Sequence, residues 1–171
     1  MGYALPIRVA DAFAAKLNGS QNGRILDVGA GTGLVGQRLN SHDYSNIDGL
    51  DISPEMLEVA RAKGCYENMI EGDLLSRLLI PDNTYNYIIS AGTFTHGHVG
   101  ASALDELLRI SKPGALFCIA INSTYFSSTG FEKKFHQLSK KITQLEFITV
   151  QIYFEGDHTD GEGVVAIFRS V

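Results

Sequence analysis

A short apolar run that stops in a cluster of glycines is the feature that most constrains the fold of this chain. The run is Ile25 to Val28, and Gly29, Gly31 and Gly33 follow it closely. Because glycine has no side chain, the backbone can turn tightly there and a ligand can approach it. Free backbone N–H groups at the start of a helix attract anionic or polar groups. The pattern therefore predicts a strand, a ligand-binding turn and then a helix over residues 34–40.

Helical and strand-like patterns alternate along most of the chain. Such alternation is typical of a parallel sheet that is covered by helices on both faces. The segments are assigned by their apolar spacing and by the turn residues that bound them. Helices are predicted over residues 5–18, 53–63, 104–110 and 133–141, and further strands over residues 46–51, 68–71, 85–90 and 115–121.

The last part of the chain departs from this alternation. Gln144 to Phe154 and Val164 to Phe168 are both strand-like, and a polar loop with three glycines joins them. Two such runs predict an antiparallel hairpin at the sheet edge. The expected fold is one α/β domain over residues 1–171. Its doubly wound, seven-stranded sheet is mostly parallel, with an antiparallel last strand and helices on both faces.

Composition excludes several classes of protein. The net charge of −5 supplies no basic surface for phosphate contacts, which argues against direct nucleic-acid binding. No apolar run approaches the ~20 residues of a membrane helix, and no secretory signal is visible. Cys65 and Cys118 have no metal-type spacing, so we expect reduced thiols, no metal site and a cytoplasmic location. The sequence is compatible with a monomer or a homodimer.

Three aspartates stand near the ends of the first three predicted strands. Asp27 precedes the glycines, Asp51 closes the second strand and Asp73 follows the third. Ligands of open parallel sheets bind at this carboxyl edge. A carboxylate at Asp51 can accept hydrogen bonds from both hydroxyls of a ribose. Asp27 can attract an ammonium group, and Asp73 can accept from an adenine amino group. Their ordered occurrence predicts a site for a nucleoside cofactor.

A nicotinamide dinucleotide is the alternative ligand for this turn. Gly31, Gly33 and Gly36 fit the G-x-G-x-x-G spacing of dinucleotide-binding folds, and Asp51 suits either cofactor. The register argues against this alternative, because the match begins two residues after the usual junction between strand and turn. Gly29, in contrast, follows the strand directly.

Five segments, taken in order, resemble the class I S-adenosylmethionine-dependent methyltransferases. They are I-L-D-V-G-A-G-T-G from residue 25, G-L-D-I-S-P-E-M-L from 49, E-G-D-L from 71, Y-N-Y-I-I-S-A-G-T-F-T-H from 85 and K-P-G-A-L-F from 112. The terminal hairpin is similar to the family's antiparallel seventh strand. Within the family, residues 91–99 resemble a small group related to the Williams-Beuren syndrome-associated methyltransferase-like protein.

The resemblance implies S-adenosylmethionine as cofactor and assigns roles by position. The methionine end would lie on the glycine turn, the ribose on Asp51 and the adenine between apolar residues that follow the second and third strands. The sulfonium would lie near the end of the fourth strand. The implied residues are Asp27, Gly29, Ala30, Gly31, Asp51, Ile52, Met56, Gly72, Asp73, Leu74, Ser90, Ala91 and Gly92.

The methyl acceptor is less constrained than the cofactor. Histidine accepts protons near neutral pH, so His96 and His98, after the fourth strand, are the candidate catalytic residues. The family's Asn/Asp-Pro-Pro-aromatic signature of amino-group methylation is absent there. By elimination, we expect in-line methyl transfer to a small molecule.

The short N-terminal segment keeps other functions open. Such enzymes often carry further N-terminal residues that close over the cofactor, whereas only about two dozen residues precede the first strand here. A catalytically silent cofactor-binding module, acting as a regulatory partner, is therefore the alternative function. An NAD-dependent oxidoreductase is the third.

Overall fold

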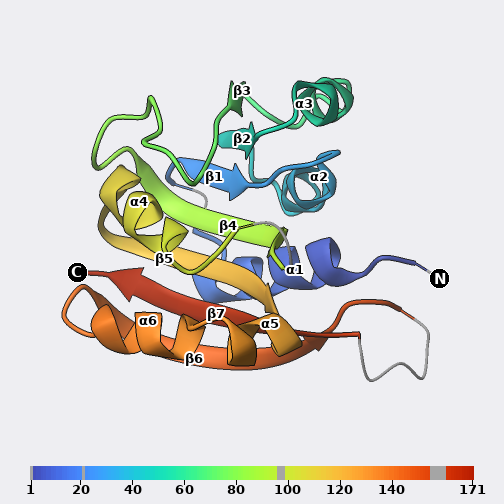
Figure 1. Cartoon of the computed structure of the whole chain (residues 1–171). Coiled ribbons are helices and arrows are strands. Elements are labelled where there is room, and N and C mark those ends of the chain that lie inside the picture. Colours follow the sequence, from blue (N-terminus) through green and yellow to red (C-terminus); the bar gives the residue numbers. More distant parts are fainter. Residues whose placement is uncertain (1, 21, 96–98, 155–160) are drawn as a thin grey trace.

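A computed structural model describes residues 2–20, 22–95, 99–154 and 161–171. Its seven strands form one sheet in the order β3-β2-β1-β4-β5-β7-β6 (Figure 1). β7 pairs antiparallel with β5 and β6, and the remaining pairs are parallel. The predicted fold is confirmed. The strands are β1 (Ile25–Val28), β2 (Ile47–Asp51), β3 (Asn68–Glu71), β4 (Tyr85–Phe94), β5 (Ser111–Asn122), β6 (Ile142–Gln151) and β7 (Glu162–Ser170).

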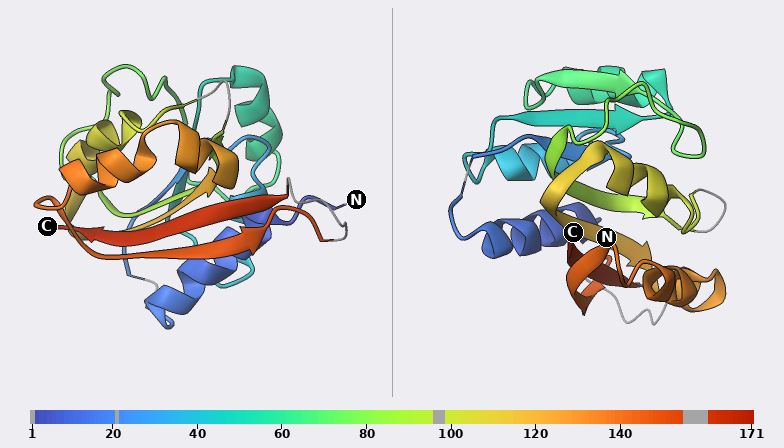
Figure 2. Two further views of the ribbon diagram at one scale, coloured as in Figure 1. Left: turned by 60° about the horizontal axis from the view of Figure 1, so that its bottom comes forward. Right: turned by 90° about the vertical axis from the view of Figure 1, so that its left-hand side faces the viewer.

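Helices cover both faces of the sheet. In the right-hand view of Figure 2, α1 and α2 lie on one side of the sheet, and α4 and α6 lie on the other. Two buried apolar clusters correspond to these layers, one beneath α1 and α2 and one beneath α4 and α6. The helices are α1 (Leu5–Leu17), α2 (Leu34–Asn40), α3 (Pro54–Arg61), α4 (Ala103–Ile110), α5 (Ser123–Ser128) and α6 (Phe131–Gln137). None of the helices in the described part of the chain has the length and apolarity to cross a bilayer.

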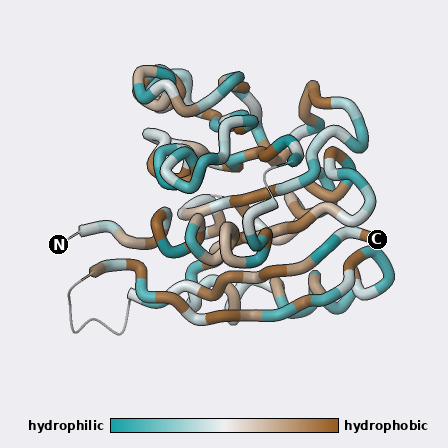
Figure 3. The backbone as a smooth tube through the Cα atoms, turned by 180° about the vertical axis from the view of Figure 1, so that it is seen from behind, coloured by the Kyte–Doolittle hydropathy of each residue, from teal (hydrophilic) through white to brown (hydrophobic). Residues whose placement is uncertain are grey.

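The central strands are apolar because helices enclose them on both sides. All four residues of β1 are buried, as are Ala115 to Ile121 in β5. Figure 3 shows hydrophobic segments running along the sheet. The parallel strands β1 to β4 end at one edge, which is where the predicted cofactor residues are brought together.

The start of α3 shows how local sequence shapes this edge. The Ser53 hydroxyl accepts a hydrogen bond from the Met56 amide at 3.2 Å, and Pro54 takes the first helical position. Leu57 of the predicted apolar face is buried, but Met56 is 45% exposed. Met56 is therefore available to a ligand at this edge.

Several predicted boundaries differ from the structure. β4 continues to Phe94 through a register shift after Ser90, so Ala91 and Gly92 lie within an irregular strand and not after it. β5 begins at Ser111, ahead of the predicted strand over 115–121. α6 spans Phe131–Gln137 and not 133–141. α5 was not predicted, because its sequence STYFSS has no apolar periodicity; the Asn122 side chain caps it by accepting from the Tyr125 amide.

Candidate functional site

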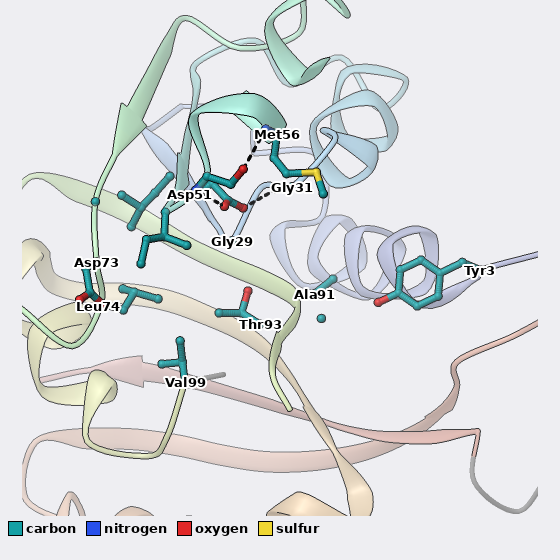
Figure 4. A pocket seen from close by; sticks show the side chains of 15 residues that line it. Tyr3, Gly29, Gly31, Asp51, Met56, Asp73, Leu74, Ala91, Thr93 and Val99 are labelled. Carbon is teal, nitrogen blue, oxygen red and sulfur yellow. Dashed lines mark hydrogen bonds between the residues drawn. The ribbon is translucent and has the colours of Figure 1, made fainter. Parts of the chain in front are cut away.

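A cavity of about 440 Å³ opens where β1 to β4 end (Figure 4). It brings together most of the predicted cofactor residues; Asp27, Ala30 and Ser90 do not line it. The lining residues are Tyr3, Gly29, Gly31, Leu50, Asp51, Ile52, Ser53, Met56, Gly72, Asp73, Leu74, Ala91, Gly92, Thr93 and Val99.

The glycine turn presents bare backbone to this cavity. A Cβ atom at Gly29 would lie 1.8 Å from the Thr93 hydroxyl oxygen, so no larger residue fits there. That hydroxyl in turn donates to the Val28 carbonyl oxygen at 2.9 Å, which ties β4 to the turn. Gly31 has a positive φ of 52°. The space beside it is open, since only the Gly29 carbonyl oxygen lies within 4 Å of its ideal Cβ. Close approach of a ligand is therefore possible at Gly31.

Two further glycines of the turn have a packing role. A Cβ at Gly36 would lie 2.3 Å from the Tyr66 ring, and one at Gly33 would lie 3.1 Å from both Ala60 and Tyr66. Neither glycine lines the cavity. Packing against α3 and Tyr66 thus explains the second and third glycines of the G-x-G-x-x-G spacing, whereas the first, Gly31, faces the cavity.

Asp51 is fixed at the centre of the cavity wall. Its Oδ2 accepts from the Gly31 amide at 2.8 Å, and its Oδ1 accepts from the Ser53 amide at 2.9 Å (Figure 4). A carboxylate has about four acceptor positions, so both oxygens can accept further hydrogen bonds. Asp51 is therefore pre-oriented for a ligand with paired hydroxyls.

The far end of the cavity combines one carboxylate with apolar walls. Asp73 Oδ1 accepts from the Leu75 amide at 2.8 Å. Of the apolar residues in the lining, Ile52 is 65% exposed and Leu74 is buried. A Cβ at Gly72 would lie 2.8 Å from a Leu78 methyl carbon, so a larger residue there would displace the leucine side chains beside it. This end suits a flat, mainly apolar ring with a polar edge.

Asp27 lies behind the turn and is fully buried. The Tyr66 hydroxyl donates to its Oδ2 at 2.6 Å and accepts from the Gly36 amide at 3.1 Å. Among the described residues, Asp27 Oδ1 has no hydrogen-bond partner. Burial raises the pKa of Asp27 to about 7; the Tyr66 hydrogen bond opposes this shift, and the Asp51 charge adds to it.

The other two predicted residues outside the lining are also buried. The Ser90 hydroxyl donates to the Val28 carbonyl oxygen at 2.8 Å. Ala30 is 6% exposed, and its amide donates to the Leu50 carbonyl oxygen at 2.9 Å. Both residues hold β1 and its turn against the neighbouring strands.

Tyr3 was not predicted as a site residue. Its phenol reaches the cavity from the N-terminal segment, and a Cβ at Gly92 would lie 2.7 Å from its oxygen. A backbone bridge to Tyr153 and a ring contact at 6.1 Å hold it there. Burial, and secondarily Tyr153, raises the pKa of the Tyr3 hydroxyl. No local sequence pattern predicts the contact between Tyr3 and Tyr153, which lie far apart in the chain.

The candidate catalytic histidines, His96 and His98, lie outside the described residues. Within the described lining, the titratable side chains are Tyr3, Asp51 and Asp73. The arrangement can bind a nucleoside through carboxylates, apolar walls and exposed backbone.

Comparison with known proteins identifies the family. Residues 26–119 match the family described as "Methyltransferase domain". Methyltransferase-like protein 27 of Homo sapiens is 34% identical over 119 residues, which are 68% of this chain and 48% of that protein. Malonyl-[acyl-carrier protein] O-methyltransferase 2 of Ilyobacter polytropus is 36% identical over 112 residues, 63% of this chain and 41% of that protein. The chain thus spans about half the length, or less, of these relatives.

Solved structures share the fold at low sequence identity. The crystal structure of MccD protein has a TM-score of 0.72 and 16% identity, and the match covers 96% of both chains. The CurJ carbon methyltransferase has a TM-score of 0.71 and 15% identity, with 98% of this chain and 54% of that one covered. The family match covers more than half of the sequence. The chain belongs to the methyltransferase-domain family, the class I S-adenosylmethionine-dependent methyltransferases.

Proposed function

We propose that this domain transfers a methyl group from S-adenosylmethionine, in line, to a small molecule. The observation that carries the proposal is that Gly31, Asp51 and Asp73 line one cavity of about 440 Å³. Bare backbone, a pre-oriented carboxylate and an apolar recess with a second carboxylate are the features that a nucleoside with a charged tail requires.

The residues present fit this cofactor on two observations. The ideal Cβ at Gly31 points into open space, so a side chain there would fill the room that the cofactor needs. Asp27 Oδ1 is buried and lacks a partner among the described residues, so a carboxyl group that a cationic ligand could pair with lies behind the turn. A buried carboxylate without compensation is costly, and a nearby ammonium group offsets that cost.

Each part of the cofactor then has a counterpart in the chain. Asp51 would hold the ribose hydroxyls, and Asp73 would accept from the adenine amino group between Ile52 and Leu74. The charge of Asp27 would attract the methionine ammonium through the turn at Gly29. The remaining proposed cofactor residues, which shape the walls or hold the turn, are Ala30, Gly31, Met56, Gly72, Ser90, Ala91 and Gly92.

Alignment and exclusion of water are the main catalytic tasks of the protein. Bound S-adenosylmethionine supplies a methyl group on a sulfonium, which is already a good leaving group. The chain must therefore orient the acceptor opposite that group and keep water out. A base is needed only for an acceptor that loses a proton, and His96 or His98 is proposed for that task.

A small-molecule acceptor is supported by charge and by the relatives. The net charge of −5 gives no footprint for nucleic acid. Relatives are named for demethylmenaquinone and for malonyl-[acyl-carrier protein]. Membership of the group related to the Williams-Beuren syndrome-associated methyltransferase-like protein is a finer proposal, which rests on residues 91–99.

One observation favours a catalytically silent module as the second candidate. The described lining contains no histidine, cysteine or lysine, and its carboxylates are assigned to the cofactor. Such a domain would bind the cofactor with no base of its own beside the acceptor.

Calorimetric titration with S-adenosylmethionine, S-adenosylhomocysteine and NAD tests the cofactor. Binding of the first two is expected, and binding of NAD alone would overturn the proposal. Incubation with methyl-labelled cofactor and a metabolite extract tests the transfer. Labelled small molecules support the enzyme, whereas cofactor binding without any labelling supports the silent module.

A further inference from the structure

β6 forms one edge of the sheet and pairs with β7 alone. From Glu146 to Gln151 the two strands pair residue by residue, after a register shift that begins at Thr143. In Figure 1, β6 is the lowest strand of the sheet. An edge strand of this kind presents unpaired backbone N–H and C=O groups on its outer side.

The two edges of the sheet differ in how they are protected. β3, at the other edge, has only four residues, and Glu67 and Glu71 carry charges at its ends. Short strands and charged side chains prevent an edge from pairing with another chain. β6 has ten residues, ITQLEFITVQ, and contains neither proline nor lysine. Its single charged residue, Glu146, forms an ion pair with Lys16 of the same chain.

Exposed hydrophobic side chains accompany this open edge. Leu145, Phe147 and Ile148 are 37%, 46% and 37% exposed. Hydrophobic segments are visible along the lowest strand in Figure 3. A long edge strand with exposed apolar side chains is a typical site of association with another chain.

The N-terminal segment forms backbone hydrogen bonds with the residues that follow β6, and not with β6 itself. The Ala4 amide donates to the Ile152 carbonyl oxygen at 2.8 Å, and the Phe154 amide donates to the Gly2 carbonyl oxygen at 3.0 Å. This pairing stops at residue 152. The regular stretch from Glu146 to Gln151 keeps an outer side that no described element pairs with.

We propose that β6 is a dimer interface, in which the β6 strands of two copies pair antiparallel across a twofold axis. Two copies that each carry a net charge of −5 repel each other at long range. β6 adds little to this repulsion, because its one charged side chain, Glu146, is paired with Lys16. A twofold interface sets the same strand against itself, and an uncharged, apolar strand is complementary to itself. The two sheets would then form one continuous sheet.

Sedimentation velocity over a range of concentrations tests the interface. We expect wild-type protein to approach twice its 18.6 kDa by about 100 µM, where an interface of micromolar Kd is saturated. Ile148→Lys should return the protein to the monomer by placing two like charges at the axis. Leu79→Lys, at a fully exposed position far from β6 in the sheet order, is the matched control and should leave the dimer intact.

Disulfide cross-linking provides a second readout that does not depend on a folded lysine variant. Ile148→Cys should form a covalent dimer on mild oxidation, because the two copies of residue 148 face each other at the axis and the native thiols, Cys65 and Cys118, are buried. A wild-type protein that stays monomeric at about 100 µM would overturn the proposal. A dimer that persists in Ile148→Lys and fails to cross-link through residue 148 would also overturn it, since another surface would then hold the copies together.

Discussion

Asp27 and Asp48 are both fully buried on neighbouring strands, but their surroundings differ. Asp48, on β2, accepts from the Arg24 guanidinium, the Asn68 amide and the Tyr85 hydroxyl, each at 2.8 Å. Asp27, on β1, accepts from one hydroxyl, and its Oδ1 has no partner among the described residues. In the parallel register Asp48 pairs with Leu26, so Asp27 lies one residue nearer the carboxyl edge.

This difference separates residues that stabilise the fold, which we call the frame, from residues of the proposed cofactor site. A buried carboxylate is tolerated when charges and donors surround it, and Asp48 ties β1 to β4 together in this way. A carboxylate that is left incomplete is destabilising by itself. Asp27 lies behind the glycine turn that lines the cavity, and we propose that its missing partner belongs to a ligand. We therefore expect changes around Asp48 to alter stability, and changes around the cavity to alter cofactor binding.

Removing the Asp48 carboxylate should have the largest effect. Asp48→Ala leaves Arg24, Asn68 and Tyr85 without their acceptor, and breaking a buried pair typically costs about 3–5 kcal/mol. The free energy of unfolding, from urea titration, should fall by this amount. Glu67→Gln, on the surface, is the control and should stay within about 0.5 kcal/mol of wild type. Equal midpoints for both variants would break the distinction between the two aspartates.

The pH dependence of the free energy of unfolding tests whether Asp27 differs from Asp48 in this way. Its folded pKa of about 7 lies above the ordinary value of 3.8, so the folded state binds the proton more tightly than the unfolded state. The stabilisation is complete below about pH 4 and is lost as the pH rises to about 7. Relative to Asp27→Asn, the wild-type free energy of unfolding should fall by about 2–4 kcal/mol across this window.

Cofactor binding should lower the pKa of Asp27 and so restore part of the stability that is lost at neutral pH. A cationic ligand beside Asp27 favours the carboxylate, so the wild-type protein should release protons on binding at pH 7 and bind more tightly at pH 8 than at pH 6. Calorimetry in buffers of different ionisation enthalpy measures the release. A wild-type stability profile parallel to that of Asp27→Asn would show that Asp27 does not titrate in this range.

The sequence predicts this frame better than it predicts the site's surroundings. The sequence predicts the bounds of β1 and β3 and, to within a residue or so, those of α2, since an apolar run or a helical pattern stops at an abrupt change of residue type. The acids at the strand ends follow from parallel topology. In contrast, nothing near Gly36 in the sequence indicates that Tyr66 fills the space above it and donates to Asp27. Such contacts depend on tertiary packing, which local patterns do not encode.

The same limitation explains the errors in β4 and β5. Proline and glycine favour a turn at residues 112–114. The structure includes them in β5, but they pair with no described strand: Ser111 pairs with Tyr85, and pairing with β4 and β7 resumes only at Leu116. The end of β4 was placed at Ser90 since the apolar run stops there, whereas the strand continues with a register shift to Phe94. Pairing of Phe94 with Ile121 therefore sets the end of β4, which the local apolar pattern does not show.

The next prediction concerns Asp51, which lines the cavity, whereas Asp27 lies behind the glycine turn. Asp51→Ala removes an acceptor for the ribose hydroxyls, and hydrogen bonds to a charged group contribute about 1.5–3 kcal/mol. The Kd for S-adenosylmethionine should rise by roughly 10- to 100-fold. Asp51→Asn keeps one acceptor oxygen for the backbone and should lose less. Calorimetry measures both, and an unchanged Kd in both variants would discredit the ribose assignment.

The smallest effect is expected at Tyr3, a residue of the N-terminal segment that lines the cavity. Tyr3→Phe removes only a hydroxyl, and one neutral hydrogen bond contributes about 0.5–1.5 kcal/mol. We expect cofactor affinity to fall by about 2- to 10-fold with little change in the midpoint of unfolding. The ring contact with Tyr153 is retained, so the segment should stay in place.

Tyr153→Phe is the matched control for this hydroxyl. Tyr153 shares the backbone bridge and the ring contact with Tyr3 but does not line the cavity. If the hydroxyl of Tyr3 acts on the ligand, only Tyr3→Phe should change the affinity. If both variants lower affinity equally, the pair acts by holding the N-terminal segment, and Tyr3 then belongs with Asp48 to the frame and not with Asp27 to the site.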